Sequence, residues 1–378
     1  NPLDDIIRKG NTLPVKFLGK ESSDNADIPF PVAGMSDQMP YDSTRFSTFD
    51  ENMLETYLEA FGKNINTAVK RFEPNIIHSH HLWLVTSLCR VLNPNIPLVA
   101  TCHNTGLRQM ELASQLSEFM VKSIRDIDSI GVIDIAQQQR VEKIYEFDQQ
   151  RPEQFFYIGQ GINTDIFCPP KDRFPREDSK KDFSIIYVGK LSFSKGVPQL
   201  IKAFKELCRE EDLPCELLLV GSGKGKEKER IYSMGKNTDN IHFLGQIEQE
   251  ELSRRFRESD LFVLPSFYDG FPKVLLESLS SGCRAIITGL PGIKETLEKS
   301  CGKTDIVQYI PQPEMKSIDQ PKEEELPKFI KSLKTLMKNQ LILCETGKKD
   351  FDYAKQVQME FSWEGLFNKY LERYHEVL

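Results

Sequence analysis

The feature that most constrains the fold is a repeated alternation of short, almost continuously apolar segments with amphipathic helical segments. In the second half, the expected strands are FSIIYVG (183–189), ELLLVG (216–221), NIHFLG (240–245), DLFVLP (260–265), RAIITG (284–289) and IVQYI (306–310). Strands that are apolar along their whole length are typical of parallel sheets covered by helices on both faces. The pattern therefore predicts an α/β fold.

The first half shows the same alternation less cleanly. Its expected strands are PVKFLG (14–19), NIIHSH (75–80), PLVATCH (97–103), SIGVI (129–133) and FFYIGQGI (155–162), and its expected helices are 51–71, 82–92, 111–126 and 134–147. A segment rich in proline and charge, 167–182, has the composition of a linker. We expect two doubly wound, Rossmann-like domains at 1–168 and 169–360, and a closing helix at 361–378 that packs back on the first domain.

The N-terminus departs from this pattern. A doubly wound domain usually opens with a strand and a glycine-rich turn, whereas this chain opens with NPLDDIIRKGNTLP and has no such turn after its first apolar segment near Val15. We expect that the chain begins partway into its first domain, without the opening strand and glycine loop. An unusual N-terminus is the alternative.

Composition limits the class of protein and its partners. The 378 residues are 39% hydrophobic and 28% charged, which is typical of a soluble globular protein. No apolar run approaches the roughly 20 residues of a membrane helix, and the N-terminus lacks a signal-peptide profile. The eight cysteines are scattered without a C-x-x-C pair, which indicates a reducing, cytoplasmic setting.

Charge is distributed unevenly along the chain. Residues 1–168 carry 15 Lys and Arg against 22 Asp and Glu, whereas the remainder balances at 34 of each. Nucleic acids and anionic lipids both reward clustered cations, so we expect no nucleic-acid partner. Peripheral membrane contact stays open, and an anionic ligand is expected in a local cationic pocket of the second half.

Ligands of open parallel sheets bind beyond the carboxyl ends of the strands. The loop KLSFSKG after 183–189 places Lys190 and Lys195 just before a helix, where two ammonium groups and free N–H groups could hold a diphosphate. The alternative is two ordinary surface lysines. The loop SGKGKEKE after 216–221 lacks the spacing of a phosphate-binding motif, so a flexible solvated turn is favoured there.

The stretch SFYDGFPKVLLESLSSG (266–282) follows another expected strand. On a helix from 272 to 281, Glu277 lies about one turn from the start and four residues after Lys273. A carboxylate there could accept hydrogen bonds from two ribose hydroxyls. Asp269, together with the backbone of Gly270 and Phe271, precedes the helix, where a donor sugar or phosphate could rest. The alternative is a turn aspartate and a solvent-exposed Lys273–Glu277 pair.

Histidines cluster in the first half. In NIIHSHH, His78 and His80 lie on the same side of a strand end, followed by His81. Zinc is disfavoured because no carboxylate stands at metal-ligand spacing, so we expect no metal. His103 ends the strand PLVATCH, where it could contact a sugar hydroxyl or serve as a buried structural histidine.

Together these segments resemble the family-4 retaining glycosyltransferases (glycosyl transferase group 1), which have the GT-B fold. IIYVGKLSFSKGVPQLIKAF is similar to their V-G-R-L-x-x-x-K-G segment, and FYDGFPKVLLESLSSG to their E-x7-E motif. LLLVGSGKGKEKERI resembles their V-G-x-G-x loop, and NIHFLGQIEQEELSRRFRESDLFVLPS their F-x-G strand and the helix after it. In the first half, VATCHNTGLR and FFYIGQGINTDIFCPP resemble the family's histidine-ended strand and N-G-V-D segment.

The resemblance implies a role for each candidate residue. Lys190 and Lys195 would bind the donor diphosphate in place of a metal, and Glu277 would hold the nucleotide ribose. The transferred sugar would meet Asp269 and the backbone of Gly270 and Phe271, with His103 facing it from the first, acceptor-side domain. Leu244 and Gly245 would lie beside the base. His103 and Asp269 are thus the expected catalytic residues.

The resemblance also implies the reaction. We expect a retaining transfer from a nucleotide-diphosphate sugar, UDP-sugar favoured over GDP-sugar, with no cofactor and with a glycan, lipid-linked or small-molecule acceptor. Three departures weaken this inference: Lys190 replaces the usual arginine, Asp269 replaces the usual first glutamate, and the N-terminal glycine loop is not in this chain. The alternatives are a nucleotide-sugar epimerase with the GT-B fold and a nucleotide-sugar-binding protein with impaired catalysis.

Overall fold

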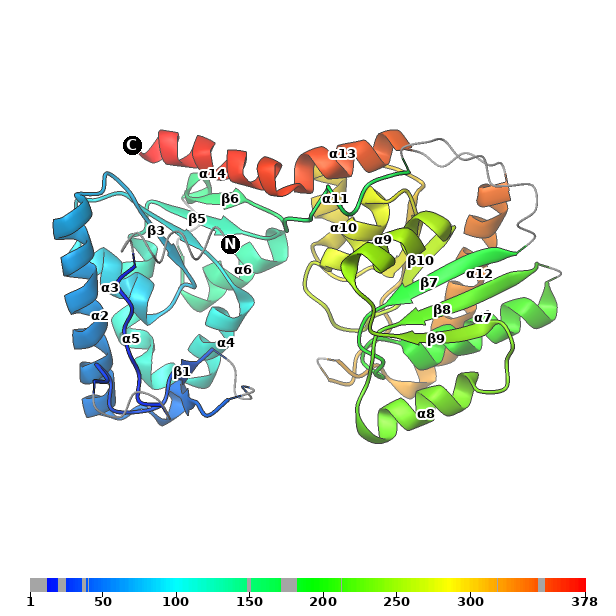
Figure 1. Cartoon of the computed structure of the whole chain (residues 1–378), viewed down its shortest axis with the longest axis horizontal. Coiled ribbons are helices and arrows are strands. Elements are labelled where there is room, and N and C mark those ends of the chain that lie inside the picture. The colour runs from blue at the N-terminus through cyan, green and yellow to red at the C-terminus, as the bar shows by residue number, and fades with distance from the viewer. Residues whose placement is uncertain are drawn as a thin grey trace. The chain divides into compact units, whose positions relative to one another are not determined.

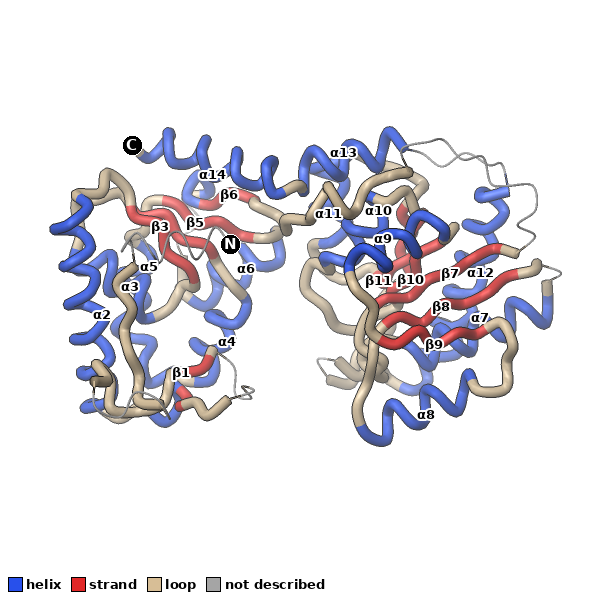
Figure 2. Tube along the Cα trace, viewed as in Figure 1, coloured by secondary structure: helices blue, strands red, loops and turns tan. Residues whose placement is uncertain are grey.

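The computed structural model of the chain describes residues 12–19, 25–35, 39, 41–147, 151–170, 182–211, 213–317, 319–345 and 351–378. The chain divides into two compact units, Asn1–Ile158 with Lys369–Leu378 and Gly159–Asn368. Each unit is built on one fully parallel sheet flanked by helices (Figures 1 and 2). The predicted α/β class is therefore confirmed. The linker predicted at 167–182 lies largely outside the described residues.

The sheet of the first unit contains four parallel strands in chain order. They are β3 (Ile77–His80), β4 (Leu98–Thr101), β5 (Ser129–Val132) and β6 (Phe155–Tyr157). The helices are α2 (Glu51–Phe72), α3 (Leu84–Leu92), α4 (Asn104–Leu112), α5 (Ser117–Arg125) and α6 (Ile135–Ile144). The single helix predicted at 111–126 is wrong: α4 begins at Asn104, directly after His103, and α5 starts separately at Ser117.

The strand predicted at 14–19 is also wrong. Phe17 makes only an isolated bridge to Ile28, and its ring packs against Tyr57 and Phe61 of α2 with centroids 6.3 Å apart. The apolar residues of this segment therefore cover a helix and do not extend the four-stranded sheet. The regular pairing nearby is limited to the two-residue strands β1 (Ala33–Gly34) and β2 (Thr44–Arg45).

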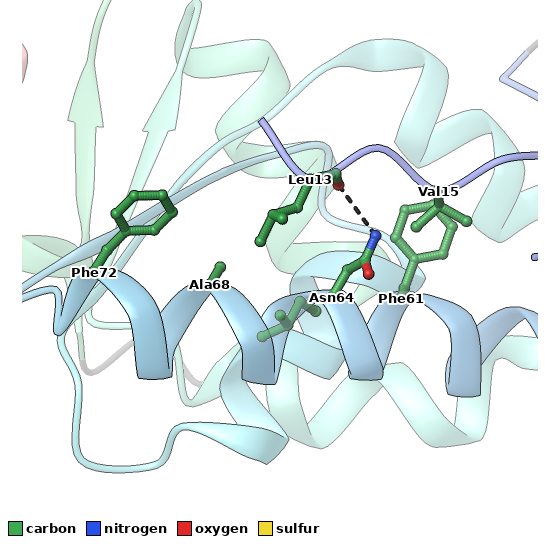
Figure 3. Close-up of a pocket in the computed structure, with 7 residues that line it drawn as sticks. Leu13, Val15, Phe61, Asn64, Ala68 and Phe72 are labelled. Atoms are coloured by element: carbon green, nitrogen blue, oxygen red, sulfur yellow. Dashed lines mark hydrogen bonds between the residues drawn. The ribbon is translucent and has the colours of Figure 1, made fainter. Parts of the chain in front are cut away.

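An apolar groove of about 310 Å³ lies along the same helix (Figure 3). Leu13 and Val15 face Phe61, Ala68 and Phe72 across it. The Asn64 side chain spans one side and donates a hydrogen bond to the carbonyl oxygen of Leu13 at 3.1 Å. This contact keeps the segment extended along α2.

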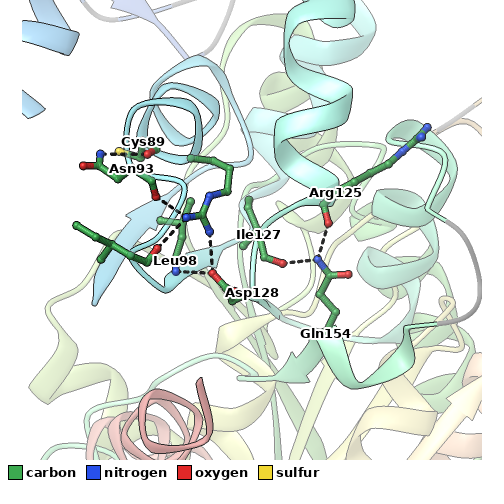
Figure 4. Close-up of polar contacts among 9 residues, drawn as sticks. Cys89, Asn93, Leu98, Arg125, Ile127, Asp128 and Gln154 are labelled. Atoms are coloured by element: carbon green, nitrogen blue, oxygen red, sulfur yellow. Dashed lines mark hydrogen bonds and ion pairs between the residues drawn. The ribbon is translucent and has the colours of Figure 1, made fainter. Parts of the chain in front are cut away.

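Polar contacts fix the amino ends of the strands in the first unit (Figure 4). Asp128, just before β5, accepts from the Arg90 guanidinium at 2.8 Å and from the Leu98 amide at the start of β4 at 2.7 Å. Gln154 donates to the carbonyl oxygens of Arg125, at 2.9 Å, and Ile127. The charge-assisted bonds of Asp128 and the amide bonds of Gln154 hold neighbouring strands in register, and their carboxyl ends are positioned as a consequence.

The second unit contains a six-stranded sheet. Its strands are β7 (Phe183–Val188), β8 (Cys215–Val220), β9 (Ile241–Gly245), β10 (Leu261–Leu264), β11 (Arg284–Thr288) and β12 (Val307–Ile310). All six predicted strands are confirmed to within a few residues. The order β12-β11-β10-β7-β8-β9 reverses between β7 and β10, which is the doubly wound arrangement.

Helices cover both faces of this second sheet. On one face α7 (Val197–Glu210) packs against α8 (Gly225–Gly235) and α12 (Leu326–Glu345). The helices that follow the other strands are α9 (Gln249–Glu258), α10 (Lys273–Ser280) and α11 (Ile293–Cys301), and α13 (Phe351–Phe361) packs on α10 and α11. Right-handed crossovers on either side of the reversal place these two groups on opposite faces.

The last helix, α14 (Trp363–Val377), ends in the first unit. There the Tyr370 hydroxyl lies 2.6 Å from Thr101 Oγ1 at the end of β4, and the Tyr374 hydroxyl lies 2.5 Å from His78 Nδ1 on β3. The final turns of the chain are thereby tied to the carboxyl edge of the first sheet. None of the described helices combines the length and apolar content required to cross a membrane.

Candidate functional site

The reversal of strand order in the second unit brings two loops together at the carboxyl edge of the sheet. The loop after β7 carries Lys190 and Lys195, and the loop after β10 carries Asp269, although these loops are more than 70 residues apart in sequence. The Phe267 amide donates to the carbonyl oxygen of Ser194 at 2.9 Å, which joins them directly. Such a switch point is where doubly wound folds bind ligands.

Gly196 makes this close approach possible. Its φ of +67° lies in the left-handed region, and a Cβ atom built on it would stand 2.0 Å from the carbonyl oxygen of Pro265. Any side chain at this position would push the two loops apart. Gly196 also precedes α7, so the positive end of that helix faces the same edge.

Lys195 and Asp269 form an ion pair. Lys195 Nζ lies 2.7 Å from Asp269 Oδ2 and donates to the carbonyl oxygen of Tyr268 at 3.2 Å. Both side chains remain about one quarter exposed, at 24% and 27%. The residues predicted as separate contacts for a diphosphate and a sugar thus hold each other, and an incoming phosphate would compete with Asp269 for the ammonium group.

Lys190 lies at the other end of the same loop. Its side chain is exposed, and its carbonyl oxygen accepts a hydrogen bond from the buried Tyr187 hydroxyl at 2.8 Å. Between the two lysines, the hydroxyls of Ser192 and Ser194 lie 3.1 Å apart. Sequence analysis did not single out these serines, although their place in a short loop with two cations could have indicated additional hydrogen-bond donors for an anion.

The glycines after β8 have a packing role that the sequence analysis missed. A Cβ atom at Gly221 would lie 1.9 Å from the carbonyl oxygen of Gly189, and one at Gly223 would lie 2.4 Å from that of Leu191. The Leu191 amide also donates to the carbonyl oxygen of Ser222 at 3.0 Å. The first residues of the segment predicted as a flexible solvated turn are therefore packed against the lysine-bearing loop through their backbone, and the rest begins α8 at Gly225.

Glu277 is buried and not solvent-exposed. It lies on α10, one turn after Pro272, and only 8% of the residue is exposed. Its carboxylate lies 3.8 Å from Lys273 Nζ, a long ion pair. Burial raises the pKa of Glu277 and Lys273 partly opposes this shift. The alternative of a solvated surface pair is thus excluded, and the carboxylate retains capacity to accept hydrogen bonds.

Gly270 and Phe271 contribute different parts to this edge. Gly270 is exposed, whereas the Phe271 ring is buried and stacks on Phe361 of α13 with centroids 5.9 Å apart. The ring therefore anchors the loop on the helical layer. The Phe271 side chain is thus not available to a ligand, and backbone contacts of this pair with a donor stay a prediction.

Leu244 and Gly245 end β9 at the same edge. The pairing with β8 slips by one residue here, because Leu219 pairs with Phe243 whereas Val220 pairs with Gly245. Leu244 is thus the extra residue of a β-bulge, a feature that redirects a side chain. Gly245 has a φ of +71° and open space around its Cα, so a planar group could approach its backbone.

His103 belongs to the first unit, where it precedes α4 at the end of β4. His103 Nε2 lies 3.1 Å from His80 Nδ1, and the His81 ring packs on it with centroids 4.5 Å apart. Burial, together with these neighbouring imidazoles, lowers the pKa of His103 to about 4. His103 is therefore a neutral hydrogen-bonding group at neutral pH.

His78 has a structural role in this cluster. Its Nε2 lies 2.8 Å from Thr101 Oγ1, and its other nitrogen contacts Tyr374. The His78 and His80 rings stack at 4.8 Å, as expected for two residues on one side of a strand. Among the residues that the structure describes, no three His, Cys, Asp or Glu side chains form a group that could hold a metal ion.

Part of the second unit is similar to a known protein family. Residues 170–305 match the family described as "Glycosyl transferases group 1". The D-inositol 3-phosphate glycosyltransferase of Corynebacterium aurimucosum is 24% identical over 262 residues, which cover 64% of this chain and 62% of that protein. The chain thus spans less than two thirds of the length of this relative.

Solved structures share the fold over most of the chain. A glycosyltransferase from Rickettsia africae superposes with a TM-score of 0.63 at 16% identity, covering 90% of this chain and 84% of that one. HepE of Anabaena in complex with UDP superposes with a TM-score of 0.57 at 16% identity, covering 84% and 82%. The chain has the GT-B fold of two Rossmann-like units. Its residues 170–305 are the part that matches the group 1 glycosyl transferases.

Proposed function

We propose that the chain is a retaining glycosyltransferase that moves a sugar from a nucleotide-diphosphate donor to an acceptor without a metal ion. The observation that carries this proposal is the Lys195–Asp269 ion pair at the carboxyl edge of the sheet. The loop after β7 also carries Lys190, and the loop after β10 leads into α10 with the buried Glu277. Cations, a helix N-terminus and a hydroxyl-accepting carboxylate are the groups that a nucleotide-diphosphate sugar requires.

The diphosphate is proposed to bind at the loop after β7. Its charge would replace Asp269 as the partner of Lys195, and the exposed Lys190 would supply a second cation. Negative charge develops on the leaving diphosphate during transfer, and two positioned ammonium groups can stabilise it as a metal otherwise would. The freed Asp269 carboxylate can then accept a hydroxyl of the transferred sugar.

The nucleotide is proposed to lie between α10 and the end of β9. Glu277 has one long ion pair, and burial raises its pKa. Hydrogen bonds donated by two ribose hydroxyls would stabilise this buried carboxylate. The base would approach the open backbone of Gly245 beside the bulged Leu244. We propose a UDP-sugar in preference to a GDP-sugar, which the UDP complex of the related Anabaena structure supports.

His103 is proposed to contact a sugar hydroxyl. Its imidazole is neutral at pH 7 because its pKa is lowered to about 4, so it can donate or accept a hydrogen bond without placing a cation beside the developing positive charge of the sugar. The acceptor is proposed to attack on the face that the nucleotide leaves, which retains the anomeric configuration without a protein nucleophile. Glycan, lipid-linked and small-molecule acceptors all fit this scheme.

All eight cysteines are free thiols, and we propose a cytoplasmic location.

The test is incubation of the chain with UDP-glucose, UDP-galactose, UDP-N-acetylglucosamine and GDP-mannose, with and without a chelator. We expect release of UDP, slow with water and faster with the correct acceptor, at the same rate in the chelator. NMR of the released or transferred sugar should show the anomeric configuration of the donor.

Other outcomes would assign other functions. An inverted product, or a rate abolished by the chelator, would contradict the proposed mechanism. Conversion of one UDP-sugar into its epimer would indicate an epimerase, and tight binding of UDP without turnover of any donor or acceptor would indicate a nucleotide-sugar-binding protein.

A further inference from the structure

Two cysteines of the second unit lie in contact at the amino edge of its sheet. Cys208 is near the end of α7 and Cys215 is the first residue of β8, and their sulfur atoms are 3.5 Å apart. Both are free thiols. This position is at the opposite end of α7 from Gly196 and the candidate site, so the donor-binding groups do not explain the contact.

The two thiols have different surroundings. Cys208 is partly exposed, whereas Cys215 is buried with 5% of its surface exposed. Asn240 Nδ2 donates to Cys208 Sγ at 3.4 Å and also to the Cys215 carbonyl oxygen at 2.8 Å. The Cys215 thiol and this amide favour a thiolate at Cys208 and lower its pKa, while the hydrogen bond to Cys208 and burial raise the pKa of Cys215.

The end of α7 is held in place beside this pair. Two lysines of α12 contact the end of α7: Lys338 Nζ lies 2.7 Å from the Glu211 carboxylate, and Lys334 pairs with Glu210. The backbones that carry the two cysteines are thus positioned independently of the sulfur contact. A disulfide requires sulfur atoms about 2.05 Å apart, and side-chain rotation can supply the remaining approach.

We propose that Cys208 and Cys215 are a redox modification site that forms a reversible intramolecular disulfide with a small-molecule disulfide as the oxidant. Cys208 is the accessible attacking thiolate and Cys215 is the resolving thiol. This proposal rests on the geometry of the second unit and is independent of the proposed transferase activity.

The chemistry proceeds in two exchanges. The Cys208 thiolate attacks one sulfur of the oxidant, which forms a mixed disulfide and releases the first small thiolate. The Cys215 thiol then gives up its proton to that thiolate and attacks Cys208 Sγ, which releases the second small thiolate. Two protein thiols are oxidised and lose two electrons, and one external disulfide is reduced to two thiols.

The expected consequence is a more stable second unit with an unchanged donor site. The link would close a short loop between α7 and β8, which restricts the unfolded chain. The lysine loop lies at the other end of α7, about 20 Å away for a helix of 14 residues at 1.5 Å per residue. Oxidation should therefore leave the affinity for UDP unchanged.

The test uses oxidised glutathione on the full chain, followed by trypsin digestion without reduction. Cleavage after Arg209 separates the two cysteines into peptides 206–209 and 210–224. We expect these peptides to be recovered as one linked species that has lost two hydrogens, and to separate after reduction. The melting temperature of the oxidised chain should rise by roughly 3–8 °C.

Single variants identify the order of attack. Cys215→Ala should stop at a glutathione adduct on Cys208, and Cys208→Ser should leave Cys215 unmodified. Cys168→Ser, at a half-buried thiol remote in sequence, should form the linked peptides as the parent does. Unlinked and unmodified 206–209 and 210–224 peptides from the parent chain would overturn the proposal, as would their linkage to other cysteines instead of each other.

Discussion

At the scale of single residues, the ion pair between Lys195 and Asp269 changes how the candidate site is understood. Sequence patterns assign these residues to different parts of a donor, yet the structure holds them 2.7 Å apart. Each therefore keeps the other in a defined position before any ligand binds. Because the pair is only partly exposed, a diphosphate that replaces Asp269 gains a lysine that is already oriented.

Lys195→Ala should weaken UDP binding by about 10–150-fold, because a charge-assisted hydrogen bond contributes roughly 1.5–3 kcal/mol. Calorimetric titration with UDP measures this loss. Lys202→Ala, at an exposed lysine on the adjoining α7, is the matched control and should stay within about twofold of the parent.

Asp269→Asn separates the two roles of the pair. It removes the competitor of the diphosphate, so UDP should bind as well as or better than to the parent, while sugar transfer falls. Equal loss of UDP affinity in Asp269→Asn and Lys195→Ala would contradict the assignment, because it would show that the pair acts only as a structural unit.

Glu277→Gln should weaken UDP binding by roughly tenfold, because the amide offers one acceptor oxygen in place of a carboxylate. The specific readout is 2′-deoxy-UDP, which should bind the parent more weakly than UDP does but should bind the variant nearly as well as UDP. Glu295→Gln, at an exposed glutamate of α11, serves as control. If the variant kept the parent's preference for the ribose hydroxyl, Glu277 would not be its partner.

At the scale of elements, sequence predicted the second sheet well because its strands are buried on both faces. Continuous apolar runs such as DLFVLP and RAIITG have no other plausible place in an α/β fold. The run at 14–19 was misassigned because short apolar alternation does not distinguish a strand from a segment that packs on a helix. In the structure, Phe17 packs against the helix α2.

The candidate site was predictable only in part. Position after an apolar strand made Lys190, Lys195 and Asp269 candidates, and the family resemblance gave them their expected roles. Their mutual contact was not predictable, because it depends on β7 and β10 being neighbours, and strand order is not encoded in local periodicity. The burial of Glu277 was likewise missed, since its spacing from Lys273 suits an exposed pair as well as a buried one.

Gly196→Ala tests whether the two loops must touch. An added Cβ would meet the Pro265 carbonyl oxygen, so we expect a loss of about 2–4 kcal/mol in the free energy of unfolding of the second unit, together with weaker UDP binding. Gly225→Ala is the matched control, because it has a similar φ of +60° but no atom within 4 Å of the added Cβ.

Gly225→Ala should cost only the backbone strain of a left-handed residue, about 1–2 kcal/mol, and should leave UDP affinity unchanged. Urea unfolding followed by circular dichroism gives the first quantity and titration gives the second. Similar effects of the two variants on UDP binding would show that the loop contact does not shape the site.

At the scale of the whole molecule, the stability of the first unit is expected to depend on pH. In the first unit, burial and mutual repulsion lower the pKa values of His78 and His103 to about 4, and those of His80 and His81 are also lowered. The unfolded chain, with histidine pKa values near 6.5, binds more protons below that pH. The stability of the first unit should therefore fall as the pH decreases from about 6.5 to 4.

Urea unfolding at pH 7 and pH 5 measures this effect, with an expected loss of roughly 1–2 kcal/mol after allowance for partial exposure. In a Trp363→Phe background the fluorescence of the buried Trp83 reports on the first unit alone. His80→Gln should reduce the pH dependence, whereas His242→Gln on β9 should not. An unfolding free energy that is the same at both pH values would contradict the neutral histidine cluster.

We propose above all that the carboxyl edge of the second sheet binds a nucleotide diphosphate. A crystal structure of the full chain with UDP tests it most directly. We expect phosphate oxygens within hydrogen-bond distance of Lys190 and Lys195, and ribose hydroxyls on Glu277, with the Lys195–Asp269 pair opened. A UDP molecule bound elsewhere, or phosphates without contact to either lysine, would contradict it.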